Sequence, residues 1–281
     1  MNQQNLDITV AIPVRNEFKN LPLCLSRLKS FKHVIVIDSD STDQTCEIAE
    51  QYGARVVKFH WNGSFPKKRN WFLRTFQFET PWVLFLDADE FIDEEFFTVV
   101  TNTIKTTSHV GFWLTYSNWF MGKKLRHGDS NRKLALFKVG SGEYERILEK
   151  NWTALDMEVH EHPVLDGTIG QINTIIDHHD YRGLTQWFQR HNDYSTWEAM
   201  RSLSLDHDGI FTHPELTPRQ FGKYKALGRW YFPISYFLVL YIWRLGILDG
   251  YAGFAYAFAK SFYFWQIGIK IKEFKKIHRI L

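Results

Sequence analysis

Short apolar runs alternate with segments of helical periodicity through the first third of the chain. The runs are Ile8–Pro13, His33–Asp38, Ala54–Phe59 and Trp82–Leu86. Strands separated by helices of about 10–15 residues are typical of a parallel sheet with right-handed crossovers. Because these runs are mostly apolar, we expect helices to cover both faces of the sheet. The spacing therefore predicts an α/β fold with a mostly parallel sheet flanked by helices.

The alternation changes near His109, where longer runs rich in aromatic and β-branched residues begin. These runs are Val110–Phe120, Leu134–Val139 and Thr168–Ile176. They predict an antiparallel or mixed extension of the sheet, and helical spacing resumes over Leu184–Leu205. We therefore predict a sheet domain over residues 1–206, a polar linker over 207–218 and a helical tail over 219–281.

The tail differs from the rest of the chain in charge and in aromatic content. The chain has 34 Lys and Arg against 31 Asp and Glu, a net charge of +3. From Arg219 to Leu281 there are 11 basic and two acidic residues, a net of +9, which leaves −6 for residues 1–218. Residues 230–265 hold 15 of the 47 aromatic side chains. Aromatics flanked by Lys and Arg suit a membrane interface, so we expect residues 219–281 to lie on a membrane surface.

Other interpretations of the tail stay open. A spanning helix needs about 20 apolar residues, and Pro233 and Arg244 confine the uncharged stretch to Tyr231–Trp243. The tail could instead form a buried helix pair or a contact in a homo-oligomer. Nucleic acid is not an expected partner, because the body is acidic and no basic-aromatic RNA motif is present.

Composition and motifs exclude several protein classes. With 44% apolar and 23% charged residues, the chain is not intrinsically disordered. Cys24 and Cys46 cannot build a disulfide scaffold, and there is no CxxC pair for zinc. Neither GxGxxG nor GxxxxGK[ST] follows the first apolar run, so the dinucleotide and P-loop cradles are missing. The N-terminus, MNQQNLD, lacks a signal-peptide pattern, which predicts a cytosolic compartment.

Acidic side chains stand where the predicted strands end. Asp38 ends the second run, and Asp87 and Asp89 follow the fourth. Ligands of open α/β sheets bind at the carboxyl ends of the strands. Clustered carboxylates are unfavourable unless a cation compensates them, and hard ions such as Mg²⁺ or Mn²⁺ prefer oxygen ligands. Asp87 and Asp89 are therefore predicted to hold one divalent ion; for Asp43 and Asp93, helix capping is the alternative.

A basic cluster, Lys67, Lys68 and Arg69, opens the predicted helix before the fourth apolar run. The N-terminus of a helix attracts anions, and basic side chains there favour a diphosphate in particular. The alternative is a solvated basic face. The cluster therefore predicts either a diphosphate-binding element or an ordinary helix surface.

These motifs together resemble the GT-A glycosyltransferases of family 2, and the resemblance covers roughly residues 6–183. The segments that carry it are AIPVRNE, VIVIDSDSTDQT, FPKKRN and WVLFLDADE. The resemblance implies a Rossmann-like GT-A fold and a nucleotide-sugar substrate. The triplet Asp87-Ala88-Asp89 resembles the family's DXD motif, whose acids hold the divalent ion that bridges the donor diphosphate.

The resemblance also assigns roles to individual residues around the nucleotide. Pro13 and Glu17, after the first strand, are expected to line the nucleotide pocket, and Asp38 resembles the acid that meets the base. Lys68 and Arg69 are expected near the diphosphate. His178, beyond the Thr168–Ile176 strand, resembles a family position near the metal and is expected as a further metal ligand. A structural histidine is an equal alternative.

The second half of the chain must supply a base, because inverting transfer removes a proton from the acceptor hydroxyl. Glu161 is our candidate, since the VHE at 159–161 resembles a short motif of this subfamily. Glu158 and Asp156 are the next candidates, and a structural pair of His160 with Glu161 is the alternative. The HEHP sequence is not HExxH, so a zinc-protease site is excluded.

The sequence thus predicts a metal-dependent, inverting glycosyltransferase that uses a nucleotide sugar, in particular a UDP-sugar, with Mn²⁺ or Mg²⁺. The expected acceptor is a lipid-linked saccharide in lipopolysaccharide or other surface-glycan synthesis. The expected location is the cytoplasmic face of the bacterial inner membrane, as a peripheral or monotopic protein. Transfer to a polyprenyl phosphate is the alternative among enzymes, and a non-catalytic, membrane-bound sugar- or nucleotide-binding module is the alternative outside them.

Overall fold

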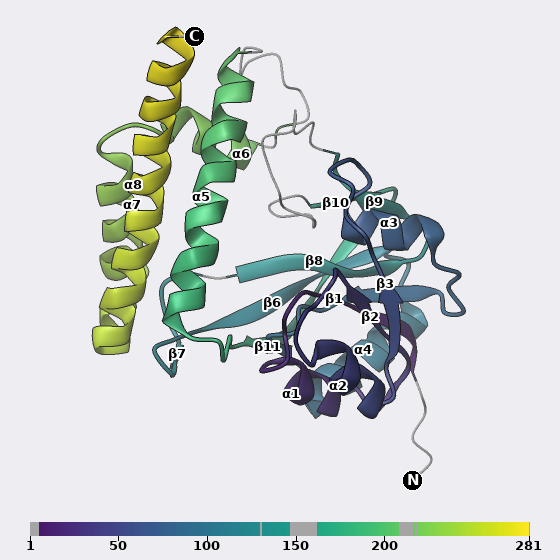
Figure 1. Cartoon of the computed structure of the whole chain (residues 1–281). Helices are drawn as coiled ribbons and strands as arrows, with labels where there is room; N and C mark the ends of the chain where they lie inside the picture. The colour runs from purple at the N-terminus through teal and green to yellow at the C-terminus, as the bar shows by residue number, and fades with distance from the viewer. Residues whose placement is uncertain (1–5, 130, 147–161, 208–215, 217, 281) are drawn as a thin grey trace. The chain divides into compact units, whose positions relative to one another are not determined.

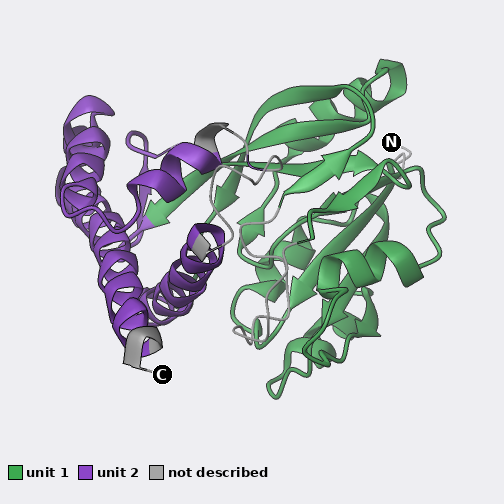
Figure 2. Cartoon of the chain, turned by 90° about the horizontal axis from the view of Figure 1, so that it is seen from above, with its two compact units in different colours: residues 1–119, 130–148, 154–182 green, residues 120–129, 149–153, 183–281 purple. Residues whose placement is uncertain are grey.

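A computed structural model describes residues 6–129, 131–146, 162–207, 216 and 218–280. The chain divides into two compact units, coloured separately in Figure 2. The first unit comprises residues 1–119, 130–148 and 154–182, and the second comprises 120–129, 149–153 and 183–281. The predicted division into a sheet domain over residues 1–206, a linker over 207–218 and a tail over 219–281 stays a prediction.

The first unit is built on one large mixed sheet. Its strand order is β3-β2-β1-β4-β8-β6-β11-β5, whereas the short strand β7 belongs to the second unit. The neighbours β3, β2, β1 and β4 run parallel, as do β6 and β11, while β8 and β5 run antiparallel to their neighbours. The bounds are β1 Leu6–Val14, β2 Phe31–Asp38, β3 Arg55–Lys58, β4 Trp82–Phe85, β5 Glu90–Phe91, β6 Gly111–Phe120, β7 Lys123–Leu125, β8 Asn131–Lys138 and β11 Ile169–His178. A separate two-stranded sheet joins β9, Gly142–Tyr144, to β10, Pro163–Leu165.

Helices cover both faces of the large sheet, as Figure 1 shows. The helices are α1 Leu21–Ser26, α2 Thr45–Gln51, α3 Lys68–Thr75 and α4 Glu94–Thr106. Along β1, Val10 and Ile12 pack into one core cluster with α1, α2 and α4, whereas Ala11 packs into another with Phe72 of α3. Successive strand residues point to opposite faces, so an entirely apolar strand needs cover on both. The predicted α/β class, with its mostly parallel sheet flanked by helices, is confirmed.

The sequence STDQT at 41–45 is a helix-capping signal and predicts a helix that starts at Ser41. The observed helix α2 begins later, at Thr45. Residues between β2 and α2 instead form a loop that is bonded to the loop after β1. Asn16 N donates to Ser41 Oγ at 2.9 Å, and Thr42 N donates to Asn16 Oδ1 at 2.8 Å. These bonds satisfy the backbone N–H groups of Asn16 and Thr42 through side chains of the opposite loop. The capping signal in STDQT therefore serves the loop, which fixes the two strand ends next to each other.

The second unit is mainly helical. It contains α5 Leu184–His207, α6 Pro218–Ala226, α7 Phe232–Leu238, the π-helical η2 Val239–Trp243, the 3₁₀-helical η3 Gly246–Asp249 and α8 Gly250–Ile280. The predicted helix over Leu184–Leu205 corresponds to α5. Tyr224, Leu227, Tyr263 and Ile267 are among the side chains of its core.

Within the described residues, no single helix is long and apolar enough to cross a membrane. One bent pair of helical segments, Phe232–Trp243 with Gly246–Ile277, meets the length and composition requirement when the two are taken together.

Candidate active site

The candidate site lies in the first unit, at the edge of the sheet where the parallel strands end. β1 and β2 are parallel and in register, with Val14 beside Asp38, so the residues that follow both strands meet at one edge. The DADE segment follows β4, which pairs with β1 on its other side. The antiparallel strand β8 contributes its first residues to the same edge. The predicted gathering of strand-end acids is therefore what the topology produces.

Asp87 is held between two cations. Arg69 Nη2 donates to its Oδ1 at 2.7 Å, and Lys133 Nζ donates to its Oδ2 at 2.6 Å. Burial alone would raise the pKa of Asp87, but the charges of Lys133 and Arg69 hold it well below its ordinary value. Asp87 therefore carries a negative charge at neutral pH, and both of its oxygens are bonded to cationic groups. Its predicted roles as a metal ligand and a cofactor-binding residue would have to compete with these bonds.

Glu90 shares the same lysine. Lys133 Nζ also donates to Glu90 Oε1, while Asp87 N donates to Glu90 Oε2 at 3.0 Å. Burial raises the pKa of Glu90 to about 7, against the lowering effect of Lys133. Conversely, burial would lower the pKa of Lys133, but Asp87 and Glu90 raise it above its ordinary value. One charged lysine thus links the first acid of the DAD triplet to the residue that follows the triplet.

Asp89 and His178 face each other across the end of the sheet. Their atoms Oδ2 and Nε2 are 3.5 Å apart, and the Asp89 side chain is almost fully buried. The contact follows from strand pairing, because β11 places His178 opposite Glu90 of β5 and His179 N donates to Asp89 O at 2.9 Å. Burial alone would lower the pKa of His178, but the neighbouring Asp89 carboxylate raises this pKa above its ordinary value.

Aromatic stacking holds the segment that follows His178. The ring of His179 lies parallel to that of Trp119, with centroids 4.5 Å apart and an angle of 2° between planes. The ring of Tyr181 also contacts that of His179, with centroids 4.1 Å apart and an angle of 34° between planes. Such stacking restricts the rotamers of these rings. The backbone that carries His178 is therefore supported from the sheet and from its neighbouring rings.

Glu17 belongs to a second ionic group at the same edge. Arg182 Nη1 donates to Glu17 Oε1 at 2.5 Å, and Asn20 Nδ2 donates to Oε2 at 2.9 Å. Arg182 also bonds Asp180, whose Oδ1 accepts from Asn20 as well. Burial raises the pKa of Glu17 to about 7, although Arg182 opposes this shift. The structure thus places the predicted nucleotide-pocket residue Glu17 in a buried network that joins the ends of β1 and β11.

Asp38 ends β2 with a completely buried side chain. Lys58 Nζ donates to its Oδ2 at 2.9 Å, and Ser41 N donates to the same oxygen at 3.2 Å. Burial opposes the charge, but the bonds from Ser41 and Lys58 bring the pKa of Asp38 below its ordinary value. Pro13 lies in β1 beside Ile37, one position before Val14 pairs with Asp38. Pro13, predicted to line the nucleotide pocket, and Asp38, predicted to meet the base, therefore lie on adjacent strands.

The basic cluster before β4 faces inward. Lys67, Lys68 and Arg69 are all buried, and Lys68 Nζ donates to Val14 O at 3.0 Å. The alternative of a solvated basic face is therefore wrong. Buried cations need acidic or carbonyl partners, and these partners come from the ends of β1 and β4. The cluster brings positive charge to the edge at which the resemblance places a diphosphate.

The site offers donor atoms that suit a divalent ion only in part. Within the described ranges, no group of three or more His, Cys, Asp or Glu side chains is arranged to hold a metal ion. Asp89 Oδ2 and His178 Nε2 form a pair of one oxygen and one nitrogen donor. Mn²⁺ accepts such mixed donors, and ions in phosphate-binding sites take several remaining ligands from the substrate and from water. The pair therefore fits an ion that is completed by a diphosphate.

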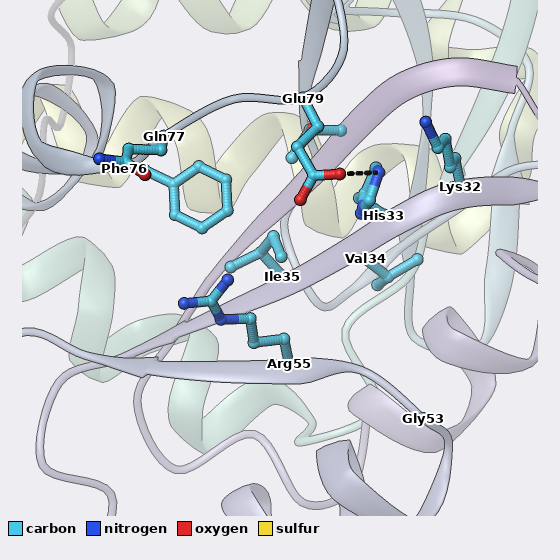
Figure 3. Close-up of a pocket in the computed structure, with 10 residues that line it drawn as sticks. Lys32, His33, Val34, Ile35, Gly53, Arg55, Phe76, Gln77 and Glu79 are labelled. Carbon is cyan, nitrogen blue, oxygen red and sulfur yellow. Dashed lines mark ion pairs between the residues drawn. The ribbon is translucent and has the colours of Figure 1, made fainter.

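A cavity of about 130 Å³ lies at the opposite edge of the sheet, where β2 and β3 begin (Figure 3). Lys32, His33, Arg55 and Glu79 are among its lining residues, and His33 Nε2 lies 3.7 Å from Glu79 Oε2. In the part of the chain that the structure describes, no predicted site residue lines this cavity. The chemistry thus concentrates at the carboxyl edge rather than in this cavity.

Comparison with known proteins matches the sheet unit to one family. The model of the family described as "Glycosyl transferase family 2" matches residues 9–160, which is more than half of the chain. The chain belongs to glycosyl transferase family 2. The predicted glycosyltransferase activity and the GT-A fold class are thereby confirmed, and the alternative of a non-catalytic module is dropped.

Individual relatives differ in how much of the chain they cover. The "Lipopolysaccharide core biosynthesis glycosyltransferase LpsC" of Rhizobium meliloti (strain 1021) is 24% identical over 277 residues, which are 93% of each chain. Glycosyltransferase SunS of Bacillus subtilis (strain 168) is 35% identical over 92 residues, 31% of this chain and 21% of its own.

Solved structures are similar at a lower level. Mannosyltransferase PcManGT from Pyrobaculum calidifontis, in complex with GDP-Man and Mn²⁺, has a TM-score of 0.46 and 13% identity over 95% of this chain and 87% of its own. Glucosyl-3-phosphoglycerate synthase from Mycobacterium tuberculosis, with Mn²⁺, UDP and glucosyl-3-phosphoglycerate, has a TM-score of 0.32 and 22% identity. That match covers 39% of this chain and 43% of the mycobacterial chain.

The sequence patterns of this family 2 glycosyltransferase did not indicate two cations of the site, Lys133 and Arg182. Lys133 precedes the predicted strand Leu134–Val139, and a strand start was not expected at the carboxyl edge. Because β8 runs antiparallel, its first residues lie there. Arg182 follows β11 and reaches Glu17, 165 residues earlier in the chain. Lys133 could have been found by assigning a direction to each strand, whereas nothing local to Arg182 indicates its partner.

The predicted base lies outside the described residues. Glu161 and the other two candidates, Glu158 and Asp156, fall within residues 147–161. Their assignment stays a prediction of the resemblance.

Proposed function

We propose that this glycosyltransferase moves a sugar, with inversion, from a UDP-sugar to a lipid-linked saccharide and requires Mn²⁺ or Mg²⁺. The observation that carries the proposal is the arrangement of buried charges at one sheet edge. There, the Asp89–His178 pair lies beside Asp87, which is bonded to both Arg69 and Lys133. A donor diphosphate is an anion that needs cations of this kind close to its oxygens.

The cations are held in place before a donor binds. Arg69 and Lys133 are anchored by the same carboxylate, and Lys68 is anchored to the backbone of Val14. A preorganised cation loses little conformational freedom when it meets an anion, which makes its electrostatic contribution larger. In the proposal, Asp87 acts by orienting Arg69 and Lys133 towards the diphosphate.

Asp89 and His178 would hold the divalent ion, together with oxygens of the donor. A bound ion would neutralise the negative charge that develops on the departing nucleoside diphosphate. His178 must be neutral to coordinate a metal, so the proton that Asp89 favours on it has to leave. Asp38, Pro13 and Glu17 would surround the nucleoside part, as the resemblance implies.

The acceptor side rests on Glu161 as the base that takes the proton of the acceptor hydroxyl. If the acceptor is a polyprenyl phosphate, it is already an anion and needs no base. Replacement of Glu161 by Gln therefore separates the two acceptor classes. Transfer to a saccharide hydroxyl should fall by about 10²–10⁴-fold, whereas transfer to a polyprenyl phosphate should be nearly unchanged.

We place the enzyme on the cytoplasmic face of the bacterial inner membrane, attached through residues 219–281 as a peripheral or monotopic protein. Two observations support this. The tail carries a net charge of +9 and much of the aromatic content, and LpsC, the relative similar over 93% of both chains, is described as a lipopolysaccharide core enzyme. A lipid-linked acceptor would be reached at that surface.

A thermal-shift screen of nucleotide sugars with and without Mn²⁺ or Mg²⁺ tests the donor site. A ligand that binds only the folded protein raises its melting temperature, by an amount set by its concentration relative to Kd. We expect a rise with UDP-sugars that requires the metal. Asp89→Ala should abolish the rise, and Asp7→Ala should keep it, because Asp7 is an exposed acid at the beginning of β1. If no nucleotide sugar shifts the wild type with either metal, the donor-site proposal is wrong.

A further inference from the structure

The second unit exposes apolar side chains along two packed helices. On α8, the exposed row is Tyr251, Phe254, Phe258, Phe262, Trp265 and Ile269. On α7 and η2, it is Tyr231, Ile234, Leu238 and Ile242. Members of each row are three or four residues apart, which puts them on one face of their helix. The opposite side of α8 carries the buried side chains Tyr263, Ile267 and Ile271.

The two helices that carry these rows pack against each other. Phe232 of α7 meets Phe264 of α8 with centroids 5.1 Å apart, and Tyr241 of η2 meets Phe254 at 5.6 Å. Figure 2 shows these helices within the second unit. A soluble monomer seldom exposes so many large apolar side chains on neighbouring helices, and such side chains mark a partner or a membrane. We call these two rows the apolar face.

The turn between the helices extends the apolar face and adds positive charge to it. Trp243 is 83% exposed, and Leu248, five residues further on, is 62% exposed. Arg244 lies between them and is also exposed, although Arg244 Nη1 donates to Asp129 Oδ1 at 3.0 Å. Aromatic and aliphatic side chains with a nearby guanidinium are the composition found at a lipid headgroup boundary.

The buried carboxylate of Asp249 binds the backbone of a second basic segment at this turn. Asp249 Oδ2 accepts from the backbone N–H of Arg126 at 3.1 Å and of His127 at 2.9 Å. The Asp249 carbonyl accepts from Lys123 Nζ at 2.6 Å. The segment 120–129 is thereby tied to the start of α8, and the exposed side chains of Lys124 and Arg126 lie on it. Positive charge is thus built into the end of the apolar face.

We infer that the apolar face docks on an anionic phospholipid bilayer, with its aromatic and aliphatic rows in the interface and its cations among the headgroups. This inference rests on the proposed membrane attachment and names its contact surface and lipid class. Charge favours a bilayer over a second copy of the chain. Of the two acids in residues 219–281, Asp249 is buried and only Glu273 is exposed, so two such faces would bring like charges together.

Flotation of the full chain with phospholipid vesicles tests the inference. We expect binding to vesicles of phosphatidylcholine with phosphatidylglycerol, and much weaker binding to phosphatidylcholine alone. Ile242→Glu should lower the vesicle affinity by about 10- to 100-fold, because an apolar side chain is replaced by a charge. The matched control is Ile175→Glu on β11, since Ile175 is 53% and Ile242 57% exposed; it should bind as the wild type does.

Charge removal separates the electrostatic part of the docking. Lys272 is an exposed lysine of α8. Arg126→Gln and Lys272→Gln should each lower the affinity for the anionic vesicles by about fivefold and leave weak binding to neutral vesicles unchanged. Lys32→Gln, an exposed lysine of the first unit, should have no effect. Equal binding to neutral and anionic vesicles would overturn the assigned lipid class.

Self-association is the competing outcome. A wild type that fails to float, but sediments as a dimer that Ile242→Glu dissociates, would overturn the inference and assign the face to a second copy. The metal-dependent thermal shift with UDP-sugars is measured without vesicles. Failed flotation with an intact shift would therefore remove only the docking inference, and a lost shift with intact flotation would remove only the donor site.

Discussion

The sheet unit encloses charged side chains at its carboxyl edge, whereas the helical unit presents apolar side chains to solvent. In the first, Lys68, Asp38 and Glu90 are buried and bonded to partners of opposite polarity or charge. In the second, Trp243 and Phe258 are exposed. Each departs from the usual placement of its residue type. Our proposals explain the first by an anionic nucleotide and the second by a lipid surface.

The buried charges of the sheet unit and the exposed apolar side chains of the helical unit have different structural causes. Charged side chains meet in the sheet unit because the direction of the strands places several polar strand ends at one edge. Exposed apolar side chains in the helical unit follow from helical periodicity, which separates an inward row from an outward row along α8. If this account is right, substitutions of similar chemistry will have different consequences in the two units.

Phenylalanine truncation should show the largest difference. Phe72→Ala in α3 removes a completely buried ring that packs against Phe76 and Phe85. The free energy of unfolding should fall by about 3–5 kcal/mol. Phe258→Ala on α8 removes a ring that is 57% exposed, and the change should stay within about 0.5 kcal/mol. Denaturant titrations of both variants decide; similar losses would mean that the α8 row is covered in solution.

Removal of the shared lysine should have the next largest effect. Lys133→Met leaves Asp87 and Glu90 without their common cation, and uncompensated buried charge destabilises the fold. The expected loss is about 2 kcal/mol, below the roughly 3–5 kcal/mol of fully enclosed pairs, because the Lys133 side chain is 33% exposed. Arg132→Met, at the neighbouring exposed position of β8, is the control. Equal losses in the two variants would show that the network adds no stability.

Asp38→Asn should have a smaller effect that depends on pH. The folded-state pKa of Asp38 is below its ordinary value of 3.8 because Ser41 and Lys58 stabilise the carboxylate against burial. Its contribution is therefore complete above the unfolded-state pKa and is lost as the pH falls through the folded-state pKa. We expect a deficit of about 1.5 kcal/mol at neutral pH that shrinks below pH 4. Unfolding free energies measured from pH 3 to 8 check this, and a constant deficit would contradict it.

The arrangement of strands was predictable because it depends on local composition. Trp82–Leu86 is apolar at every position and Ile8–Pro13 at every position except Thr9, as expected of strands covered on both faces. The strands β1 and β4 lie there. The acids after them, Asp87 and Asp89, follow automatically once strand direction is known. These parts of the site needed no knowledge of distant residues.

The partners of those acids depend on contacts that no local pattern records. Lys133 reaches Asp87 because β8 reverses direction between β4 and β6, and His178 reaches Asp89 because β11 pairs with the short strand β5. The predicted helix start at Ser41 was wrong because its hydroxyl accepts from Asn16, 25 positions earlier in the chain. Tertiary hydrogen bonds of this kind override a capping signal.

Metal-dependent turnover of a UDP-sugar by the purified chain tests the central claim most directly. Release of UDP is measured with Mn²⁺, with Mg²⁺ and with a chelator, for the wild type, Asp89→Ala and Asp7→Ala. We predict turnover that requires the ion, a loss of about 10²–10³-fold in Asp89→Ala, and wild-type rates in Asp7→Ala. Metal-dependent turnover that survives Asp89→Ala would contradict the assignment of the active site to the carboxyl edge of the sheet.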